Sequence, residues 1–131
     1  MRILIAEDDF ASRKFMLKFL SKYGECDVTV DGMEAVDAFL MGLDADMAYD
    51  LVCLDIMMPV LDGYQALKAI RDIEEDRNVP EEERAKIIMT TALNEGANVN
   101  KAFDLGCVAY AGKPIDQTKF ENVLRKLGMI S

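Results

Sequence analysis

The chain has 131 residues, of which 51% are hydrophobic and 30% charged, and its formal net charge is −9. This length suits one domain with a real core and leaves no room for a second, and the composition excludes a disordered chain. No apolar run approaches the length of a membrane span, and the negative charge argues against nucleic acid or an anionic membrane as a partner. The chain contains no histidine, which excludes histidine triads, histidine metal sites and a phosphohistidine carrier role.

The three cysteines are Cys26, Cys53 and Cys107, an odd number without the paired spacing of a metal site. This usage predicts reduced, structural thiols. The short apolar run at the N-terminus meets acidic residues at once, which is not the pattern of a signal peptide. We therefore expect a cytoplasmic protein.

Short apolar runs alternate with amphipathic segments five times along the chain. We expect strands over residues 2–6, 26–30, 51–55, 86–90 and 108–110. We expect helices over about residues 10–23, from about residue 33, over about 64–73 and 95–105, and after residue 116. Such alternation predicts an α/β fold, a doubly wound five-stranded parallel sheet with helices on both faces.

The most informative stretch runs from Leu51 to Gly63 and reads LVCLDIMMPVLDG. Four apolar residues that end in Asp55 predict a strand buried on both faces, with its acid at the carboxyl edge of the sheet. Open α/β sheets bind their ligands at that edge. Pro59 and the Asp62-Gly63 pair then predict a shaped loop before the next helix. Taken alone, the stretch fits equally well with a surface acid that ends a strand.

Parallel strands place their carboxyl ends at one edge, so the residues that end each strand should meet. The first strand delivers Glu7 and Asp8, the third Asp55, the fourth Thr91 and the fifth Lys113. Three close carboxylates repel one another and need a cation, and hard oxygen ligands with room for water suit Mg²⁺. A metal beside a strand-end aspartate, a hydroxyl and an ammonium group is equipment for phosphoryl transfer to the aspartate.

Four motifs occur in order, namely ILIAEDD at residues 3–9, LDIMMPVLDG at 54–63, IIMTTA at 87–92 and AYAGKP at 109–114. With them the chain resembles the response-regulator receiver domains of two-component signalling, a group that includes a single-domain chemotaxis regulator. The resemblance covers essentially the whole chain. It implies the flavodoxin-like strand order 2-1-3-4-5 and a single receiver domain over residues 1–131 with no output domain.

The resemblance implies that Asp55 is the phosphoacceptor, which takes its phosphoryl group from a phosphohistidine on a sensor histidine kinase or phosphotransfer protein. Asp8, Asp55 and the backbone carbonyl of Met57 would bind Mg²⁺, and Glu7 would act through water or orient the site. In the family, the positions of Met57 and Leu93 tune the loss of the phosphoryl group to water. Because both residues are apolar here, we expect self-dephosphorylation that is not fast.

The resemblance also implies a cis bond between Lys113 and Pro114, with Lys113 paired to the acid at rest and to the phosphoryl group afterwards. Thr91 would move to hydrogen-bond the phosphoryl oxygen, and Tyr110 would follow it from an outward to an inward position. Simpler interpretations remain open from the residues alone. Asp8 fits a helix cap, Lys113 an exposed lysine, Thr91 a strand-end hydroxyl bonded to backbone, and Tyr110 a static aromatic.

We therefore expect a phosphorylation-dependent switch that is not an enzyme, beyond catalysing its own phosphoryl transfer and dephosphorylation. The fourth and fifth helices and the last strand would present its output to a separate effector protein, or to a second copy in a homodimer. One alternative is a receiver-like interaction module that carries no phosphate. Another is a Mg²⁺-dependent phosphohydrolase, which would want a second acid where Met57 stands. The connector at residues 74–84 is expected to be solvated.

Overall fold

The computed structural model describes residues 1–92 and 99–131. Its strands are β1 (Arg2–Ala6), β2 (Glu25–Thr29), β3 (Leu51–Asp55), β4 (Lys86–Ala92) and β5 (Ala109–Lys113). Its helices are α1 (Phe10–Leu20), α2 (Gly32–Asp44), α3 (Gly63–Asp76), α4 (Val99–Asp104) and α5 (Gln117–Lys126), with a short 3-10 helix η1 (Glu81–Glu83) before β4. Leu93 and the predicted start of the fourth helix lie outside the described residues.

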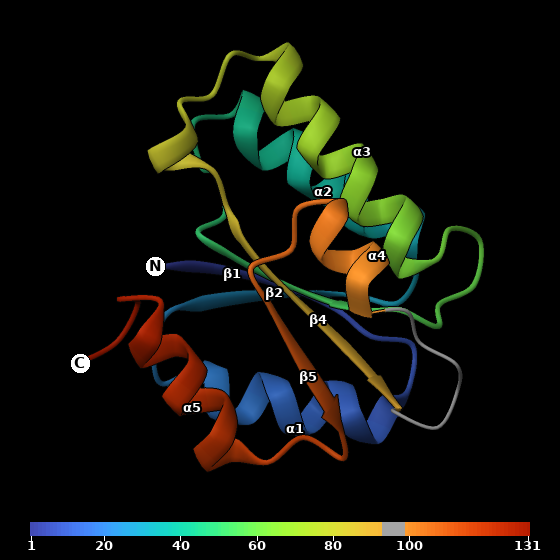
Figure 1. Ribbon diagram of the computed structural model, residues 1–131, viewed down its shortest axis with the longest axis vertical. Helices are drawn as coiled ribbons and strands as arrows, with labels where there is room; N and C mark the ends of the chain where they lie inside the picture. Colours follow the sequence, from blue (N-terminus) through green and yellow to red (C-terminus); the bar gives the residue numbers. More distant parts are fainter. Residues whose placement is uncertain (93–98) are drawn as a thin grey trace.

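The five strands form one parallel sheet in the order β2-β1-β3-β4-β5. Helices α1 and α5 cover one face of the sheet, and α2, α3 and α4 cover the other (Figure 1). The doubly wound α/β fold and its strand order are thereby confirmed. The central strand β3 is buried along its whole length, which explains why its sequence is a continuous apolar run that ends in an acid.

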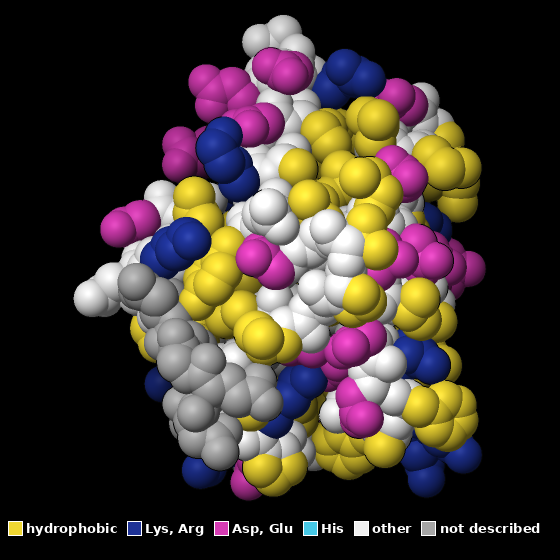
Figure 2. Space-filling model, turned by 90° about the vertical axis from the view of Figure 1, so that its right-hand side faces the viewer, with side chains coloured by type: hydrophobic (Ala, Val, Ile, Leu, Met, Phe, Trp, Pro, Cys, Tyr) yellow, Lys and Arg dark blue, Asp and Glu magenta, His cyan; other side chains and the backbone are white. Residues whose placement is uncertain are grey.

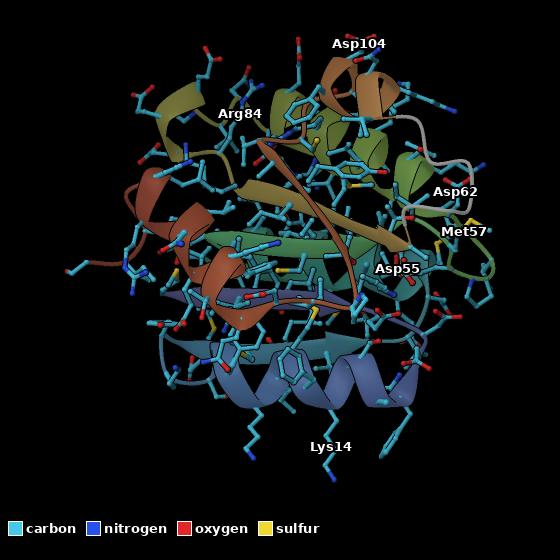
Figure 3. The ribbon with its side chains drawn as sticks, turned by 60° about the horizontal axis from the view of Figure 1, so that its bottom comes forward. Lys14, Asp55, Met57, Asp62, Arg84 and Asp104 are labelled. Atoms are coloured by element: carbon cyan, nitrogen blue, oxygen red, sulfur yellow. The ribbon has the colours of Figure 1, made fainter. Side chains whose placement is uncertain are left out.

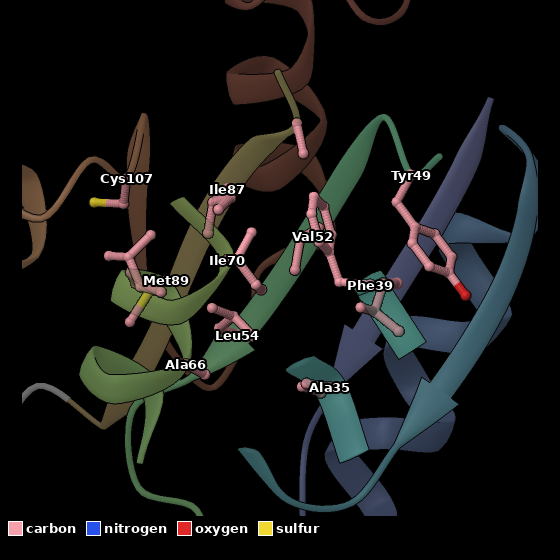
Figure 4. Packing of buried hydrophobic residues seen from close by; sticks show 14 of the residues in the cluster. Ala35, Phe39, Tyr49, Val52, Leu54, Ala66, Ile70, Ile87, Met89 and Cys107 are labelled. Carbon is pink, nitrogen blue, oxygen red and sulfur yellow. The ribbon is translucent and has the colours of Figure 1, made fainter. Parts of the chain in front are cut away.

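The core consists of two hydrophobic clusters, one on each face of the sheet. Val52 and Leu54 of β3 point into the cluster under α2 and α3, where they meet Ile70 (Figure 4). The intervening residues of β3 point to the other face, because successive side chains of a strand alternate. There the rings of Phe19 and Phe120 join α1 to α5 in an edge-on contact, with centroids 5.5 Å apart.

Four helices start at an aspartate whose side chain accepts a hydrogen bond from the backbone N–H three residues on, an N-cap that stabilises each helix start. The capping residues are Asp9 for α1, Asp31 for α2, Asp62 for α3 and Asp116 for α5. For α1, the cap is Asp9 and not Asp8. The side chain of Asp8 is therefore left for another role.

The last strand is longer than the sequence predicted, because β5 runs from Ala109 to Lys113 and not from residue 108 to 110. Its pairing with β4 continues to the end, with Thr91 opposite Gly112 and Ala92 opposite Lys113. The parallel ladder thus carries Lys113 to the same edge of the sheet as Asp55.

The prediction of a solvated connector from residue 74 is wrong at its start. Helix α3 continues past this point, and Glu74 is 1% exposed. Its carboxylate accepts hydrogen bonds from the Arg71 guanidinium (2.6 Å) and the Ala85 N–H (2.8 Å), while Arg71 also donates to the carbonyls of Ala85 and Gly106. Burial of this acid is possible because a guanidinium and a backbone N–H satisfy it. The second acidic run forms η1 and is exposed, as expected.

The three cysteines are free, and Cys53 and Cys107 are buried. Burial raises the pKa of the Cys53 thiol and keeps it protonated. Within residues 1–92 and 99–131, no helix has the length and apolar character needed to cross a membrane.

Candidate functional site

Three carboxylates meet where β1 and β3 end. One oxygen each of Glu7, Asp8 and Asp55 lies within 4.8 Å of the other two. Glu7 and Asp55 are only 1% and 3% exposed, whereas Asp8 is exposed to solvent. Figure 2 shows this edge of the sheet, where acidic side chains gather between hydrophobic ones. The parallel topology therefore brings together the three acids that the sequence singled out.

Lys113, at the end of β5, reaches into this cluster. Its ammonium group lies 3.1 Å from Oδ2 of Asp55 and also pairs with Oε1 of Glu7. The side chain of Lys113 is 18% exposed, so this ion pair is largely shielded from water. The bond between Lys113 and Pro114 is cis, as expected. One cation thus faces two buried carboxylates, which leaves the site with an excess of negative charge.

This excess charge and the burial of the site alter the ionisation of its groups. The pKa of Asp55 is raised to about 7; burial is the largest cause, Glu7 adds to it, and Lys113 opposes both. Burial by itself lowers the pKa of Lys113, but the two carboxylates outweigh burial and the pKa is raised. The lysine therefore stays charged, and any further cation bound here would favour the ionised form of Asp55.

The loop after β3 is shaped around Asp55. The Met57 N–H points at Oδ1 of Asp55, at 3.3 Å, and Met57 itself lies in the loop beyond the strand ends (Figure 3). The loop closes where the Gly63 N–H donates to the carbonyl of Ile56 at 2.9 Å. A Cβ at Gly63 would lie 2.4 Å from the carbonyl oxygen of Asp55, so only glycine fits here. Val60 adopts φ = 69°, a left-handed conformation that is unusual for a β-branched residue.

Thr91 lies near the end of β4, and Tyr110 lies near the start of the neighbouring strand β5, opposite Met89. Thr91 is 1% exposed, and its hydroxyl donates to the carbonyl of Ala92 at 3.3 Å. Tyr110 packs against the core cluster under α2 and α3, and its hydroxyl is buried without a hydrogen-bond partner among the described residues. Burial raises the pKa of Tyr110. Tyr110 therefore occupies an inward position.

A protein-family model described as "Response regulator receiver domain" matches residues 3–125 of the chain. The chain belongs to this family. Among curated proteins, the "Probable transcriptional regulator ycf27" of Guillardia theta is 37% identical over 125 residues, which are 95% of this chain and 44% of that protein. "Hybrid signal transduction histidine kinase I" of Dictyostelium discoideum is 34% identical over 119 residues, 88% of this chain and 6% of that protein. This receiver domain thus spans less than half the length of either relative.

Solved receiver structures share the fold. The receiver domain of the histidine kinase CKI1 from Arabidopsis thaliana, complexed with Mg²⁺, superposes with a TM-score of 0.80 at 29% identity and covers 96% of this chain and 90% of its own. The receiver domain of sensor histidine kinase PA1611 from Pseudomonas aeruginosa, with magnesium in its active-site cleft, gives 0.77 at 26% identity, with 95% and 94% covered. The yeast complex of Ypd1 with the receiver domain of Ssk1 gives 0.81 at 26% identity, with 98% and 88% covered.

The donor set of this receiver domain fits a hard divalent cation. Glu7, Asp8 and Asp55 offer carboxylate oxygens, and the cluster contains no nitrogen or sulfur ligand. One lysine against three acids leaves charge that a divalent ion would neutralise. The backbone N–H of Met57 donates to Asp55 at 3.3 Å. Metal binding by the Met57 carbonyl stays a prediction.

Two residues near the receiver site were missed by the sequence interpretation. Arg13 of α1 donates from Nη1 to the carbonyl of Glu7 at 2.9 Å and lies 3.4 Å from the carbonyl of Asp8. The Asp9 N–H donates to Oε2 of Glu7 at 3.2 Å. A basic residue one turn after the capping aspartate was the only signal in the sequence, and such a residue is usually solvated.

Proposed function

We propose that the protein is a phosphorylation-dependent signalling switch in which Asp55 accepts a phosphoryl group from a phosphohistidine. The observation that supports this most is the buried carboxylate of Asp55, which ends the central strand 3.1 Å from the Lys113 ammonium and within reach of two further acids. A lone acid in such a place would be costly to bury, so the arrangement favours a group that reacts.

The proposed chemistry is an in-line transfer. A carboxylate oxygen of Asp55 attacks the phosphorus, the bond between phosphorus and the donor imidazole nitrogen breaks, and an acyl phosphate forms on Asp55. Lys113 offsets charge on the phosphoryl oxygens, and the Met57 N–H is placed to donate a hydrogen bond to them. Asp8, Asp55 and the Met57 carbonyl would hold Mg²⁺, with Glu7 acting through water, and the ion would supply positive charge against the same phosphoryl oxygens.

The proposed switch joins this site to the surface of α4, β5 and α5. Thr91 moves to hydrogen-bond a phosphoryl oxygen, and the inward position of Tyr110 accompanies that movement. Because Tyr110 is already inward here, phosphorylation would stabilise a conformation that the unmodified chain reaches, as in a population shift. The chain catalyses only its own phosphoryl transfer and dephosphorylation.

The proposed phosphodonor is a sensor histidine kinase or a phosphotransfer protein, and the proposed place of action is the cytoplasm. The yeast complex of a phosphotransfer protein with a similar receiver domain supports the class of donor. The proposed reader is a separate effector protein, with homodimerisation on phosphorylation as the other outcome that size-exclusion chromatography would reveal. We expect neither nucleic acid nor membrane to be a partner, since the chain carries a net charge of −9.

The test is intact-mass spectrometry after incubation with acetyl phosphate, with Mg²⁺ or with EDTA, beside Asp55→Asn. We expect a Mg²⁺-dependent gain of one phosphoryl group that the variant does not show. No gain in a folded protein that binds Mg²⁺ would contradict the proposal and favour an interaction module without phosphate. Turnover of phosphorylated small molecules would instead favour a phosphohydrolase.

A further inference from the structure

The short turn between β1 and α1 carries two of the three acids of the site, and its path sets where they point. From the strand side, the Glu7 N–H donates to the carbonyl of Thr29 at 3.1 Å. From the helix side, the Asp9 N–H donates to the carboxylate of Glu7. Asp8 stands between these anchors. Among the described residues, its side chain makes no hydrogen bond or ion pair, so its position depends on its backbone.

Arg13 is the side chain that holds this backbone. Its Nη1 donates to the carbonyl of Glu7 at 2.9 Å and approaches the carbonyl of Asp8 at 3.4 Å. The guanidinium also lies over the ring of Phe10, 5.6 Å from its centroid. Arg13 is half-buried. One guanidinium therefore holds the backbone of both residues in the turn that offer carboxylates to the site, Glu7 and Asp8.

The contribution of Arg13 to α1 itself does not explain this placement. Arg13 stands in the first turn of the helix, where the helix dipole disfavours a cation. The helix start is already capped by Asp9. In this position the guanidinium instead contacts the backbone carbonyls of Glu7 and Asp8.

We propose that Arg13 is a positioning residue for the metal site: by holding the carbonyls of Glu7 and Asp8, it keeps the Asp8 carboxylate facing Asp55. The inference rests on the proposed function in so far as that function requires a divalent ion at these acids. Residues that orient metal ligands without touching the metal strongly affect metal affinity, as Arg13 does here through the backbone.

The charge of Arg13 and its positioning role predict opposite changes in Mg²⁺ affinity when the residue is replaced, which makes the inference testable. Removal of a cation near the acids would tighten Mg²⁺ binding if charge alone mattered. A positioning role predicts the reverse. Arg13→Met keeps the length of the stem and a good helix former while it removes the donor and the charge. Arg13→Lys keeps the charge and one donor group.

The experiment is calorimetric titration of Mg²⁺ into the wild type, Arg13→Met and Arg13→Lys, with thermal unfolding in EDTA as a separate readout of stability. We expect Mg²⁺ binding to weaken roughly tenfold in Arg13→Met and by a smaller factor in Arg13→Lys, with similar unfolding midpoints. The matched control is Lys14→Met, since Lys14 is exposed and points into solvent (Figure 3).

Unchanged or tighter Mg²⁺ binding in Arg13→Met would overturn the inference. If Arg13→Met does not fold, Arg13→Lys decides alone, because its loss of the bridge to two carbonyls should still weaken Mg²⁺ binding relative to Lys14→Met. Failure of the wild type to bind Mg²⁺ would contradict the metal site itself. Mg²⁺ binding without phosphorylation would contradict only the proposed switch.

Discussion

The ammonium group of Lys113 lies 3.1 Å from Oδ2 of Asp55, although the two residues end strands that are separated by β4. The register explains the contact, since Asp55 lies opposite Thr90 and Lys113 lies opposite Ala92 on the strand between them. Lys113 therefore stands two residues further along the sheet and can fold back over the strand ends. The pair is a product of the sheet order and of the full length of β5.

Stability should depend on pH through Asp55. In the folded protein the pKa of Asp55 is raised to about 7, so this carboxyl keeps its proton up to about that pH, whereas an ordinary aspartate has a pKa of 3.8. The folded state therefore binds more protons between these pH values, and its stability falls as the pH rises through them. Because one pKa unit corresponds to about 1.4 kcal/mol, Asp55→Asn should be more stable than the wild type at pH 8 by on the order of 2–4 kcal/mol, with little difference at pH 4.

Urea unfolding in metal-free buffer at the two pH values measures this difference. Asp104→Asn, at an exposed position of α4, is the control, and its stability relative to the wild type should be the same at both pH values. A gain for Asp55→Asn that is the same at pH 4 and pH 8 would show that ionisation of Asp55 is not its cause.

Loss of Lys113 should destabilise the site in a way that metal reverses. Lys113→Met leaves Glu7 and Asp55 buried without their cation, which should lower the free energy of unfolding at pH 8 by about 2 kcal/mol. The loss is below the usual cost of a broken buried pair because Asp55 can take up a proton. Mg²⁺ should recover part of it, as followed by thermal unfolding with and without the ion. An equal loss in both conditions would mean that Lys113 contributes by packing and not by charge.

The buried acid of α3 should contribute strongly to stability. Glu74→Ala removes the carboxylate that pairs with the Arg71 guanidinium and accepts from the Ala85 N–H, which should cost about 3 kcal/mol. Glu75→Ala, one residue on and exposed, should change stability by less than about 0.5 kcal/mol. Urea unfolding of both variants gives the comparison. Similar small effects would refute the structural role of Glu74.

Strain at Val60 should be removable. Its φ of 69° is unfavourable for a β-branched residue but acceptable to asparagine, so Val60→Asn should raise the free energy of unfolding by about 1 kcal/mol. Val60 is 77% exposed, so little packing is lost. Val60→Ile, which keeps the branch, should give no gain in the same urea unfolding experiment. Destabilisation by asparagine would indicate that the valine side chain has contacts worth more than the strain.

The placement of Asp55 was predictable because two simple rules act in the same direction. A short apolar run that ends in an acid predicts a buried strand, and parallel strands share one carboxyl edge. Glu7 and Asp8 follow β1 by the same logic. The distances among the three acids follow from the strand order, which the residues alone did not reveal and the family resemblance supplied.

The role of Glu74 was not predictable from its acidic neighbours. It lies four residues after Ile70 and seven after Leu67, on the buried face of α3. The spacing of Glu74 therefore matched the buried face of the helix. An acid at such a position is normally taken as the point where the apolar face ends, unless its buried partners are known. Those partners are the backbone N–H of Ala85, just before β4, and the guanidinium of Arg71, whose side chain also reaches the carbonyl of Gly106. Such contacts depend on tertiary packing, as does the inward position of Tyr110.

The most direct measurement is to locate the phosphoryl group after treatment with acetyl phosphate and Mg²⁺. Borohydride reduces an aspartyl phosphate to homoserine, and tandem mass spectrometry of the digested protein then identifies the residue. The account predicts homoserine at position 55 alone, and none when Mg²⁺ is withheld. Homoserine at position 8 or 9 in place of 55, or no reduced residue in a protein that binds Mg²⁺, would contradict it.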